Sequence, residues 1–297
     1  MADPTKSQIE HPSAYFVQDR SNQEEMIRLQ LQDQLITTSM GGVLPEQPDP
    51  ASFQRVLDVG SGTGGWLIEV AKAYPTIKLL IGVDVSQKMV DYAKEQAKAQ
   101  GVGDRVEFHV MNALRTLEFP NAFFDLINQR LGWSWVRVWE WPKLLEEFQR
   151  VAQPGGTIRI TEGGWMTGNS DAMMKLHHLA LEASFYSGHL FIEDQNNSII
   201  DRLPGLLERY GVQHIQTWAH NLTFPAETPQ GKIFHEDIQH LFHVALPFMH
   251  RWAHVPDDYE VIYQQMLEEA QRPDFVGQWS FLTAWGEHGR SITSETP

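Results

Sequence analysis

Three glycines and two carboxylates in the first third of the chain have the spacing of a site that holds a nucleoside. Residues 56–65 read Val-Leu-Asp-Val-Gly-Ser-Gly-Thr-Gly-Gly, which predicts an apolar strand, a glycine turn and the start of a helix. Glycine lets the backbone adopt positive φ and approach a ligand closely. Asp84 ends the next apolar segment, 20 residues after Gly64. A carboxylate at that strand end can accept hydrogen bonds from both hydroxyls of a ribose, so the pattern predicts a nucleoside-containing cofactor.

The identity of the cofactor depends on residues around this turn. The glycines also satisfy the G-x-G-x-x-G fingerprint of dinucleotide-binding proteins, which is a weak signal by itself. Asp58 lies two residues before Gly60, and a carboxylate at that place suits an ammonium group better than a pyrophosphate. Asn112 follows a strand-like segment, residues 105–110, where an amide can face the amino group of an adenine. A Pro-Gly-Gly turn at residues 154–156 then joins a predicted helix to a fifth strand.

Together these motifs resemble the class I S-adenosyl-L-methionine (SAM) dependent methyltransferases, in the ubiquinone-biosynthesis-like branch that acts on small molecules. The resemblance covers residues 12–165 and weakens beyond them. It implies an α/β fold with a Rossmann-like, mostly parallel seven-stranded sheet, helices on both faces, an antiparallel last strand and helical lid inserts. It also implies that SAM is the cofactor.

The resemblance assigns parts of SAM to particular residues. Asp58 and the glycine loop hold the methionine part, Asp84 holds the ribose, and Asn112, where the family more often has Asp, reads the adenine. The implied cofactor-binding residues are Asp58, Gly60, Ser61, Gly62, Thr63, Gly64, Asp84, Val85, Met89, Met111, Asn112, Ala113 and Gln129. Other interpretations stay open. The glycines can form a tight turn that binds no ligand, and Asn112 can be a plain turn residue. Asp84 can be the N-cap of the following helix, although Ser86 suits that role better.

The residues that bind the methyl acceptor are less constrained, and no catalytic residue is assigned. Arg130 follows the fourth predicted strand and either anchors an acidic or carbonyl group or pairs with a nearby carboxylate. Trp133 belongs to a series of tryptophans that either lines an aromatic pocket or packs in the fold. Glu162 ends the fifth predicted strand. It is either a base for the acceptor or a carboxylate with a partner at the rim of the pocket. The candidates are Tyr15, which can seal the methionine end, Arg130, Trp133 and Glu162, and the other tryptophans are Trp135, Trp139 and Trp141.

Composition limits the class of protein. The formal net charge of −15, from 23 Lys and Arg against 38 Asp and Glu, disfavours nucleic acid as a substrate because the chain repels polyphosphate. The chain has no cysteine, which excludes disulfides, thiolate metal sites and a cysteine nucleophile. It has no signal-like apolar run at its start and no apolar stretch of 18 residues. We therefore expect a cytoplasmic enzyme, monomeric or homodimeric, without a membrane partner.

Thirteen histidines raise the question of a metal, and five of them lie in one segment. Two pairs in this segment have the spacing of residues on one face of a helix. The segment that begins at His235 nevertheless has one residue too many for the H-E-x-x-H motif of zinc enzymes, so no metal site is predicted. The possibility that one of these histidines acts as the base for the acceptor stays open. The five are His235, His240, His243, His250 and His254.

The elements that must position these residues alternate between strand and helix. Strands are predicted near residues 56–59, 78–83, 105–110, 123–128 and 157–162, and helices near 65–74, 87–100 and 142–152, which favours a parallel sheet with helices on both faces. An amphipathic helix over 21–38, with Ser21 and Glu24 at capping-box spacing, precedes them. After residue 165 we expect helices at 171–187 and 199–210, strands at 212–218 and 275–285, and a helical insert at 231–270.

The division that we expect is an amino-terminal helix and lid segment (1–50), a SAM-binding core (51–165), the rest of the sheet with acceptor-covering inserts in the same domain (166–288) and a tail (289–297). The favoured activity is transfer of the methyl group of SAM to a small hydrophobic or aromatic molecule, on oxygen or nitrogen, with carbon also compatible. The alternatives are an RNA or protein methyltransferase, a SAM-binding protein without catalysis and an NAD-dependent oxidoreductase.

Overall fold

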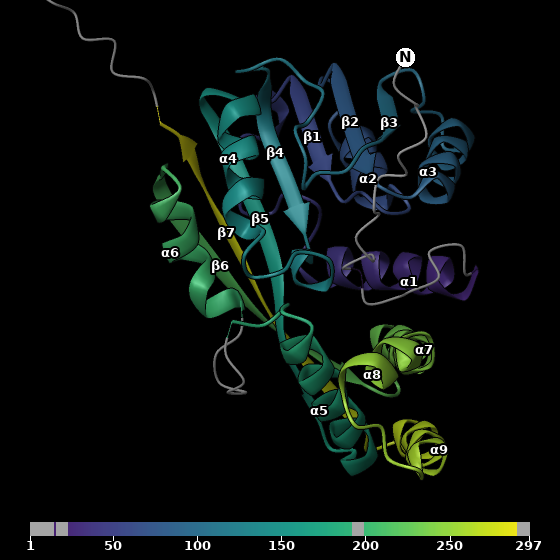
Figure 1. The fold of residues 1–297 in the computed structure, drawn as a ribbon. Helices are drawn as coiled ribbons and strands as arrows, with labels where there is room; N and C mark the ends of the chain where they lie inside the picture. The colour runs from purple at the N-terminus through teal and green to yellow at the C-terminus, as the bar shows by residue number, and fades with distance from the viewer. Residues whose placement is uncertain (1–14, 16–22, 192–198, 290–297) are drawn as a thin grey trace, which may run out of the picture.

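The computed structural model describes residue 15, residues 23–191 and residues 199–289, and a seven-stranded sheet forms its centre (Figure 1). The strand order is β3-β2-β1-β4-β5-β7-β6. Strands β1 to β5 run parallel, and β7 is antiparallel to both β5 and β6, which confirms the predicted mostly parallel sheet with an antiparallel last strand. The strands are β1 (Arg55–Val59), β2 (Leu79–Asp84), β3 (Val106–Val110), β4 (Phe124–Arg130), β5 (Ala152–Gly168), β6 (Val212–Pro225) and β7 (Val276–His288).

Helices cover both faces of this sheet because each carries apolar residues at helical spacing on one side. On one face, α2 (Gly65–Ala73) and α3 (Gln87–Ala99) share a core with β1 to β3 that contains Trp66 and Phe108. On the other face, α4 (Trp141–Val151) and α6 (Ile199–Arg209) share a core with β1, β4 and β5 that contains Phe148. The predicted two-faced architecture is therefore confirmed.

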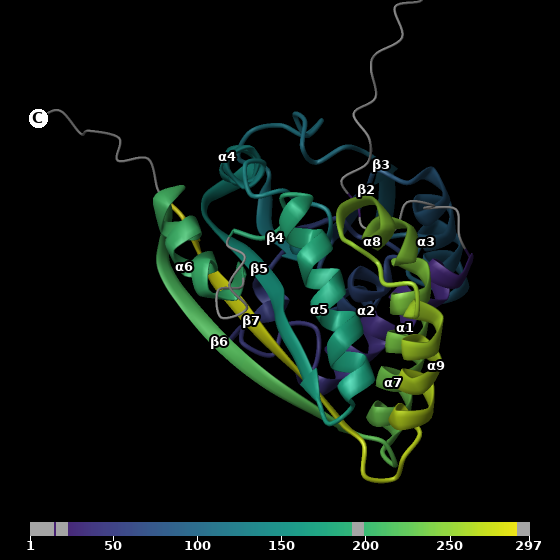
Figure 2. The same cartoon turned by 60° about the horizontal axis from the view of Figure 1, so that its bottom comes forward.

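Five further helices form a cap beyond the carboxyl ends of β1 to β4, as Figures 1 and 2 show. They pack around a third core with the far ends of β5 to β7, which extend past the other strands. The predicted strands at 157–162 and 212–218 were too short for this reason, since β5 continues to Gly168 and β6 to Pro225. The cap helices are α1 (Gln23–Ser39), α5 (Asp171–Tyr186), α7 (Pro229–Val244), α8 (Leu246–Trp252) and α9 (Tyr259–Ala270).

Helix α1 differs from the simple amphipathic helix expected at its position. Its buried residues include Glu25, Arg28 and Gln32, whereas Ile27 is 43% exposed. Charged side chains are tolerated there because they pair with one another and with α7, against which α1 packs. The prediction of an apolar buried face was thus only partly correct, and its capping residue Ser21 lies outside the described residues.

A helix that spans a membrane has to be both long and strongly apolar. Within residues 23–191 and 199–289, no helix meets both requirements.

Candidate cofactor and acceptor site

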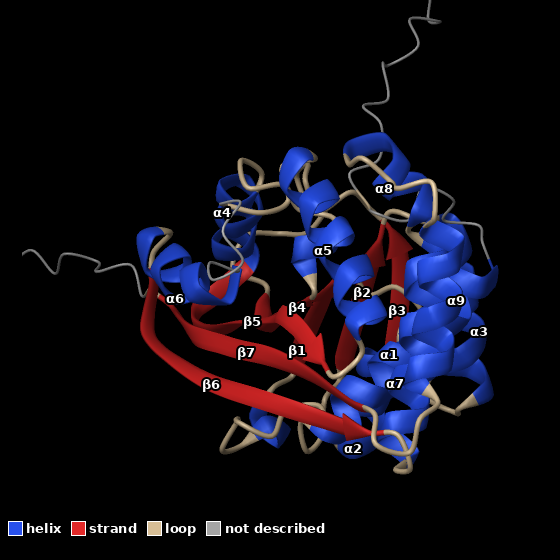
Figure 3. Ribbon diagram, turned by 90° about the horizontal axis from the view of Figure 1, so that it is seen from below, coloured by secondary structure: helices blue, strands red, loops and turns tan. Residues whose placement is uncertain are grey.

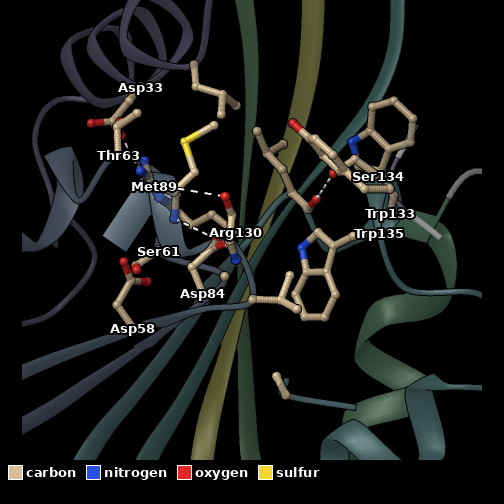
Figure 4. A pocket seen from close by; sticks show the side chains of 18 of the residues that line it. Asp33, Asp58, Ser61, Thr63, Asp84, Met89, Arg130, Trp133, Ser134 and Trp135 are labelled. Carbon is tan, nitrogen blue, oxygen red and sulfur yellow. Dashed lines mark hydrogen bonds and ion pairs between the residues drawn. The ribbon is translucent and has the colours of Figure 1, made fainter. Parts of the chain in front are cut away.

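A pocket of about 630 Å³ lies between the carboxyl ends of the central strands and the cap (Figure 4). In open α/β sheets, ligands bind at these strand ends, and here the order of the strands reverses at β1 and β4. Most of the predicted cofactor residues line the pocket, namely Asp58, Gly60, Ser61, Gly62, Thr63, Asp84, Val85, Met89, Met111, Asn112 and Ala113.

The glycine turn between β1 and α2 needs glycine for two different reasons. Gly60, Gly62 and Gly64 all have positive φ, at 71°, 52° and 78°. Gly64 does not line the pocket, because it faces the protein: a Cβ there would come within 2.6 Å of the Phe108 ring and 2.8 Å of the Ala93 methyl group. Its role in this structure is close packing of the turn on β3 and α3, while Gly60 and Gly62 face the pocket.

The Asp84 carboxylate lies at the end of β2 and is fixed by two backbone amides. The Gly62 amide donates to Oδ2 at 3.0 Å and the Ser86 amide donates to Oδ1 at 2.8 Å. Ser86 caps α3, accepting from the Met89 amide at 3.4 Å, as the sequence favoured. Since Asp84 does not have to cap the helix, its half-buried carboxylate is directed to the pocket with its orientation already set.

Asp58 lies deeper, at the end of β1, and is 4% exposed. Its Oδ1 accepts a hydrogen bond from the Asn128 side-chain amide at 2.7 Å. Asn128 in turn accepts from the buried guanidinium of Arg159 at 2.7 Å, and Arg159 pairs with Glu46 at 2.7 Å. Burial raises the pKa of Asp58 to about 7, although the positive charge of Arg130 acts in the opposite direction. The site therefore holds a buried carboxyl that a cationic group would stabilise in its charged form.

Two polar side chains of the pocket differ in how they are used. The buried hydroxyl oxygen of Ser61 has no hydrogen-bond partner among the described residues. Asn112 uses its Oδ1 to accept from the Leu114 amide at 2.9 Å, which is the turn role that the sequence left open. The Asn112 amino group and the second lone pair of Oδ1 are then left for a ligand.

Arg130 extends from the end of β4 toward α1 and pairs with Asp33 (Figure 4). It also donates to the Thr37 hydroxyl at 3.2 Å, and its guanidinium carbon lies 5.8 Å from the centre of the Trp66 ring. Of the two roles predicted for Arg130, the structure contains the ion pair. This pair holds α1 across the pocket, since Asp33 and Arg130 both line it.

Glu162 and Gln129 were predicted in the site and do not line the pocket. Glu162 is in the middle of the long β5, not at its end, and it is fully buried. Its carboxylate accepts from the backbone amides of Gly132 at 2.7 Å and Trp133 at 3.2 Å, and from the Gln129 side chain at 3.1 Å. Burial raises its pKa to about 7. Both residues therefore support the loop after β4 from beneath.

The four tryptophans near this loop separate into three environments. Trp133 and Trp135 line the pocket, with the Trp135 ring against Gly60. Trp139 is 61% exposed, and Trp141 is fully buried in the core under α4. The predicted aromatic pocket thus contains two of the four (Figure 4).

Tyr15 and Arg28 line the end of the pocket that is formed by the cap, which we call the far end. They belong to a buried polar cluster. The Tyr15 hydroxyl donates to Glu25, and the Arg28 guanidinium donates to the same carboxylate at 2.7 and 2.9 Å. Arg28 also pairs with Asp237 of α7 at 3.3 Å. Burial raises the pKa of Asp237 to about 6, against the lowering effect of Arg28. The cluster joins α1 to α7 at the edge of the pocket.

The rest of this end is apolar and comes from segments far apart in the sequence. Its side chains belong to α1, the loop after β4, β5, α7 and β7, namely Leu29, Ile36, Leu131, Met166, Leu241 and Trp279. Sequence reasoning missed these residues, and it also missed Arg28, Gln32 and Asp33 of α1. Polar residues among the apolar positions of α1 were the available signal, because a helix that only packs on a core has no need of them.

The histidine-rich insert forms α7 and α8 and the segment after α8. The Nδ1 atoms of His240 and His243 lie 2.8 and 2.9 Å from carboxylate oxygens of Glu24 on α1. Within the described ranges, no group of three or more His, Cys, Asp or Glu side chains is arranged to hold a metal ion. In this structure the two histidines connect α7 to α1.

Part of the chain is similar to known proteins. Residues 56–156 match the family model of a methyltransferase domain. A demethylmenaquinone methyltransferase from Porphyromonas gingivalis is 31% identical over 115 residues, which cover 38% of this chain and 45% of that protein. A 27-O-demethylrifamycin SV methyltransferase from Amycolatopsis mediterranei is 29% identical over 128 residues, covering 42% and 43%. A solved phosphoethanolamine N-methyltransferase 2 from Haemonchus contortus, in complex with SAM, has a TM-score of 0.48 at 21% identity, covering 85% of this chain and 52% of that chain.

The strand order and the residues at the strand ends resemble what was expected of a class I SAM-dependent methyltransferase. Residues 56–156, the part that contains the glycine turn, Asp84 and Asn112, are a SAM-dependent methyltransferase domain. The matches to the two curated relatives span less than half the length of each. The family match favours a methyltransferase over the dinucleotide-binding alternative.

Proposed function

We propose that this protein transfers the methyl group of SAM to a small, hydrophobic or aromatic acceptor. The observation that carries the proposal is one continuous pocket with two different ends. Carboxylates and a glycine turn line one end, and mostly apolar side chains of the cap line the other. A cofactor held at the first end directs its reacting group toward an acceptor at the second, which is the arrangement that proximity catalysis requires.

The cofactor end fits SAM through the donors and acceptors that it presents. Asp84 accepts from the ribose hydroxyls, and Asp58 faces the ammonium group, whose positive charge compensates the cost of ionising a buried carboxyl. The partnerless Ser61 hydroxyl gains a hydrogen bond from the ligand. The Asn112 amino group reads the adenine, and Val85, Met89, Met111 and Ala113 form the apolar walls around it.

SAM supplies an electrophilic methyl group on a sulfonium, so the protein has to orient the acceptor and exclude water. Helix α1 performs the second task, since Ile36 and Leu29 cover the pocket while the ion pair of Asp33 with Arg130 fixes the helix to β4. Trp133 and Trp135 bound the opposite wall and present ring surface to an acceptor (Figure 4). Methylation of oxygen or nitrogen is favoured, and the pocket also accommodates an activated ring carbon.

The polar cluster at the far end gives the acceptor a defined orientation. Arg28 and Gln32 line the pocket beside an otherwise apolar wall, so an acceptor with one polar group and an apolar body fits best. The two curated relatives are named for different small molecules, demethylmenaquinone and 27-O-demethylrifamycin SV. Their range supports a small-molecule acceptor and leaves its structure to experiment.

The test has two stages. Thermal-shift measurements compare SAM, S-adenosylhomocysteine (SAH) and NAD, and radiolabelled SAM is then used with libraries of phenols, amines and activated rings. We expect SAM and SAH to raise the melting temperature and NAD to leave it unchanged. Stabilisation by NAD alone would overturn the cofactor assignment. Binding of SAM without transfer to any member of the libraries would favour a SAM-binding protein without this activity.

A further inference from the structure

Strand β6 forms one edge of the sheet and is open along its outer side. Among the described residues it pairs with β7 alone. Figures 2 and 3 show it as the outermost strand, bowed along the margin of the molecule. Residues 216–219 are all exposed, although successive side chains of a strand point to opposite faces. The part of the chain that the structure describes therefore leaves both faces of the sheet uncovered at the middle of β6.

Between its bulge and its last residue, this edge lacks the charged side chains that usually keep edge strands apart. Exposed edges usually carry charged residues, and above all lysine, because unpaired backbone groups otherwise recruit another strand. Strand β6 reads VQHIQTWAHNLTFP and has no Lys, Arg, Asp or Glu, in a chain of which 21% is charged. It also exposes an aromatic pair, since Trp218 is 43% exposed and stacks on His220 with 5.1 Å between ring centres.

We propose that β6 is the interface of a homodimer, in which the β6 strands of two copies pair antiparallel across a two-fold axis. An antiparallel edge is complementary to its own copy, as a two-fold interface requires. Charge points to the same partner: two chains of net charge −15 repel each other over most of their surface, and β6 is a long strip without that repulsion.

The geometry of β6 limits where the copies meet. His214 has φ of 53°, and the register with β7 shifts between Gln213 and Gln216. Such a bulge twists an edge out of line, so pairing begins after it. At the other end Pro225 has no backbone N–H to donate. The paired segment is therefore residues 216–224, which places Trp218 inside the interface.

The interface is separate from the cofactor and acceptor pocket, because no residue of β6 lines that pocket. Each copy keeps its own site. The proposal of a dimer and the proposed activity can therefore be tested independently. SAH binding reports on the cofactor site, and the mass in solution reports on the dimer.

The test is the mass of the full chain in solution, measured by sedimentation equilibrium over a range of micromolar concentrations. We expect twice 34.0 kDa for the natural sequence. The variant Thr217→Glu with Ala219→Glu adds two negative charges to each copy inside the paired segment and is expected to give a monomer. Two matched controls keep the dimer: Thr217→Gln with Ala219→Gln has similar size without charge, and Val261→Glu adds a charge at a position that is 67% exposed on α9.

Unchanged circular dichroism and SAH binding establish that the glutamate variant is folded. A natural chain that stays monomeric throughout the range contradicts the proposal, and so does a dimer that the glutamate variant leaves intact. If the chain dimerises only after residues 290–297 are removed, its own tail covers β6, and the proposal for the full chain is wrong.

Discussion

At the scale of single residues, the two carboxylates of the cofactor end differ in what surrounds them. Asp84 is half-buried and receives two backbone amides, which stabilise its charged form. Asp58 is buried and receives one neutral amide, and its pKa is raised to about 7. The second therefore changes its charge within the physiological range of pH.

The Asp84 carboxylate is expected to supply a large part of the affinity for SAM. Asp84→Ala removes charge-assisted hydrogen bonds of about 1.5–3 kcal/mol each, so SAM affinity should fall at least roughly tenfold. Calorimetric titration measures this change. The control is Asp91→Ala, an exposed residue on the outer side of α3, which should bind SAM normally. Equal affinity of the Asp84 variant and the natural protein would exclude Asp84 as the ribose ligand.

The Asp58 carboxyl should make SAM binding depend on pH. Its pKa is raised to about 7 by burial, and a bound ammonium favours the ionised form, so affinity should decline as the pH falls from about 7.5 to 5.5. The window ends near pH 7.5 because the α-amino group of the ligand itself loses its proton at about 7.7–8.0. In Asp58→Asn, titrations across the same window should give a weaker and flat profile. A natural protein with a flat profile would show that the ammonium binds elsewhere.

At the scale of elements, the loop after β4 depends on the buried Glu162. The folded pKa of this carboxyl is about 7, above its ordinary value of 4.5. The folded state therefore binds the proton more tightly, and its contribution to stability is lost as the pH rises from about 4.5 to 7. One pKa unit corresponds to about 1.4 kcal/mol, which sets the scale of the effect at a few kcal/mol.

Glu162→Gln tests this directly, because it removes the titration and retains one acceptor oxygen. Urea unfolding at pH 5 and pH 7.5 should show a smaller loss of stability with rising pH in the variant than in the natural protein. Comparing the two slopes cancels the contributions of Asp58 and Asp237, which have the same sign. Identical slopes would mean that Glu162 does not change its proton occupancy on folding.

Helix α1 is expected to act as the cover of the pocket through the pair of Asp33 with Arg130. Asp33→Ala breaks this pair, whose side chains are 19% and 18% exposed, so global stability should change by only about 1 kcal/mol. Hydrogen exchange in α1 should rise clearly, and SAM affinity should fall, because the cover opens more often. The control is Gln30→Ala, at an exposed position of the same helix. Unchanged exchange in α1 would show that other contacts hold it.

The elements that the sequence predicted well are those whose signals are local. The strand, glycine turn and helix around Gly60 are set by neighbouring residues, and Asp84 follows from the same βαβ unit. The roles of Gly64, Gln129 and Glu162 could not be predicted, because they depend on which side of the strand end each residue faces. The acceptor end depends on contacts between α1 and the cap, for which the sequence contains no fixed spacing.

At the scale of the whole molecule, the long strands β5 to β7 combine two tasks. Their far ends hold the cap over the pocket, and the outer margin of β6 remains open for a second copy (Figure 3). The sequence indicated the sheet and the helical inserts, but the lengths of β5 and β6 were underestimated, since both strands continue beyond their predicted ends into the cap core. The chain as a whole carries a formal net charge of −15.

This charge predicts how the proposed dimer responds to salt. Raising the ionic strength from about 10 mM to about 150 mM shortens the screening length from about 30 Å to about 8 Å, which weakens the repulsion between the two acidic copies. Dimerisation should therefore become stronger with salt, as sedimentation equilibrium can measure. Weaker dimerisation with added salt would indicate an interface built on ion pairs instead of the uncharged β6.

The most direct measurement is a crystal structure of the protein with SAH. We predict that the ribose hydroxyls contact the Asp84 carboxylate and that the amino group lies beside Asp58. The sulfur should face the far end of the pocket, which is bounded by Ile36, Met166 and Leu241. Density for SAH outside this pocket, or with the adenosine at the apolar far end, would contradict the assignment of the two ends of the pocket. It would also contradict the methyl transfer inferred from that assignment.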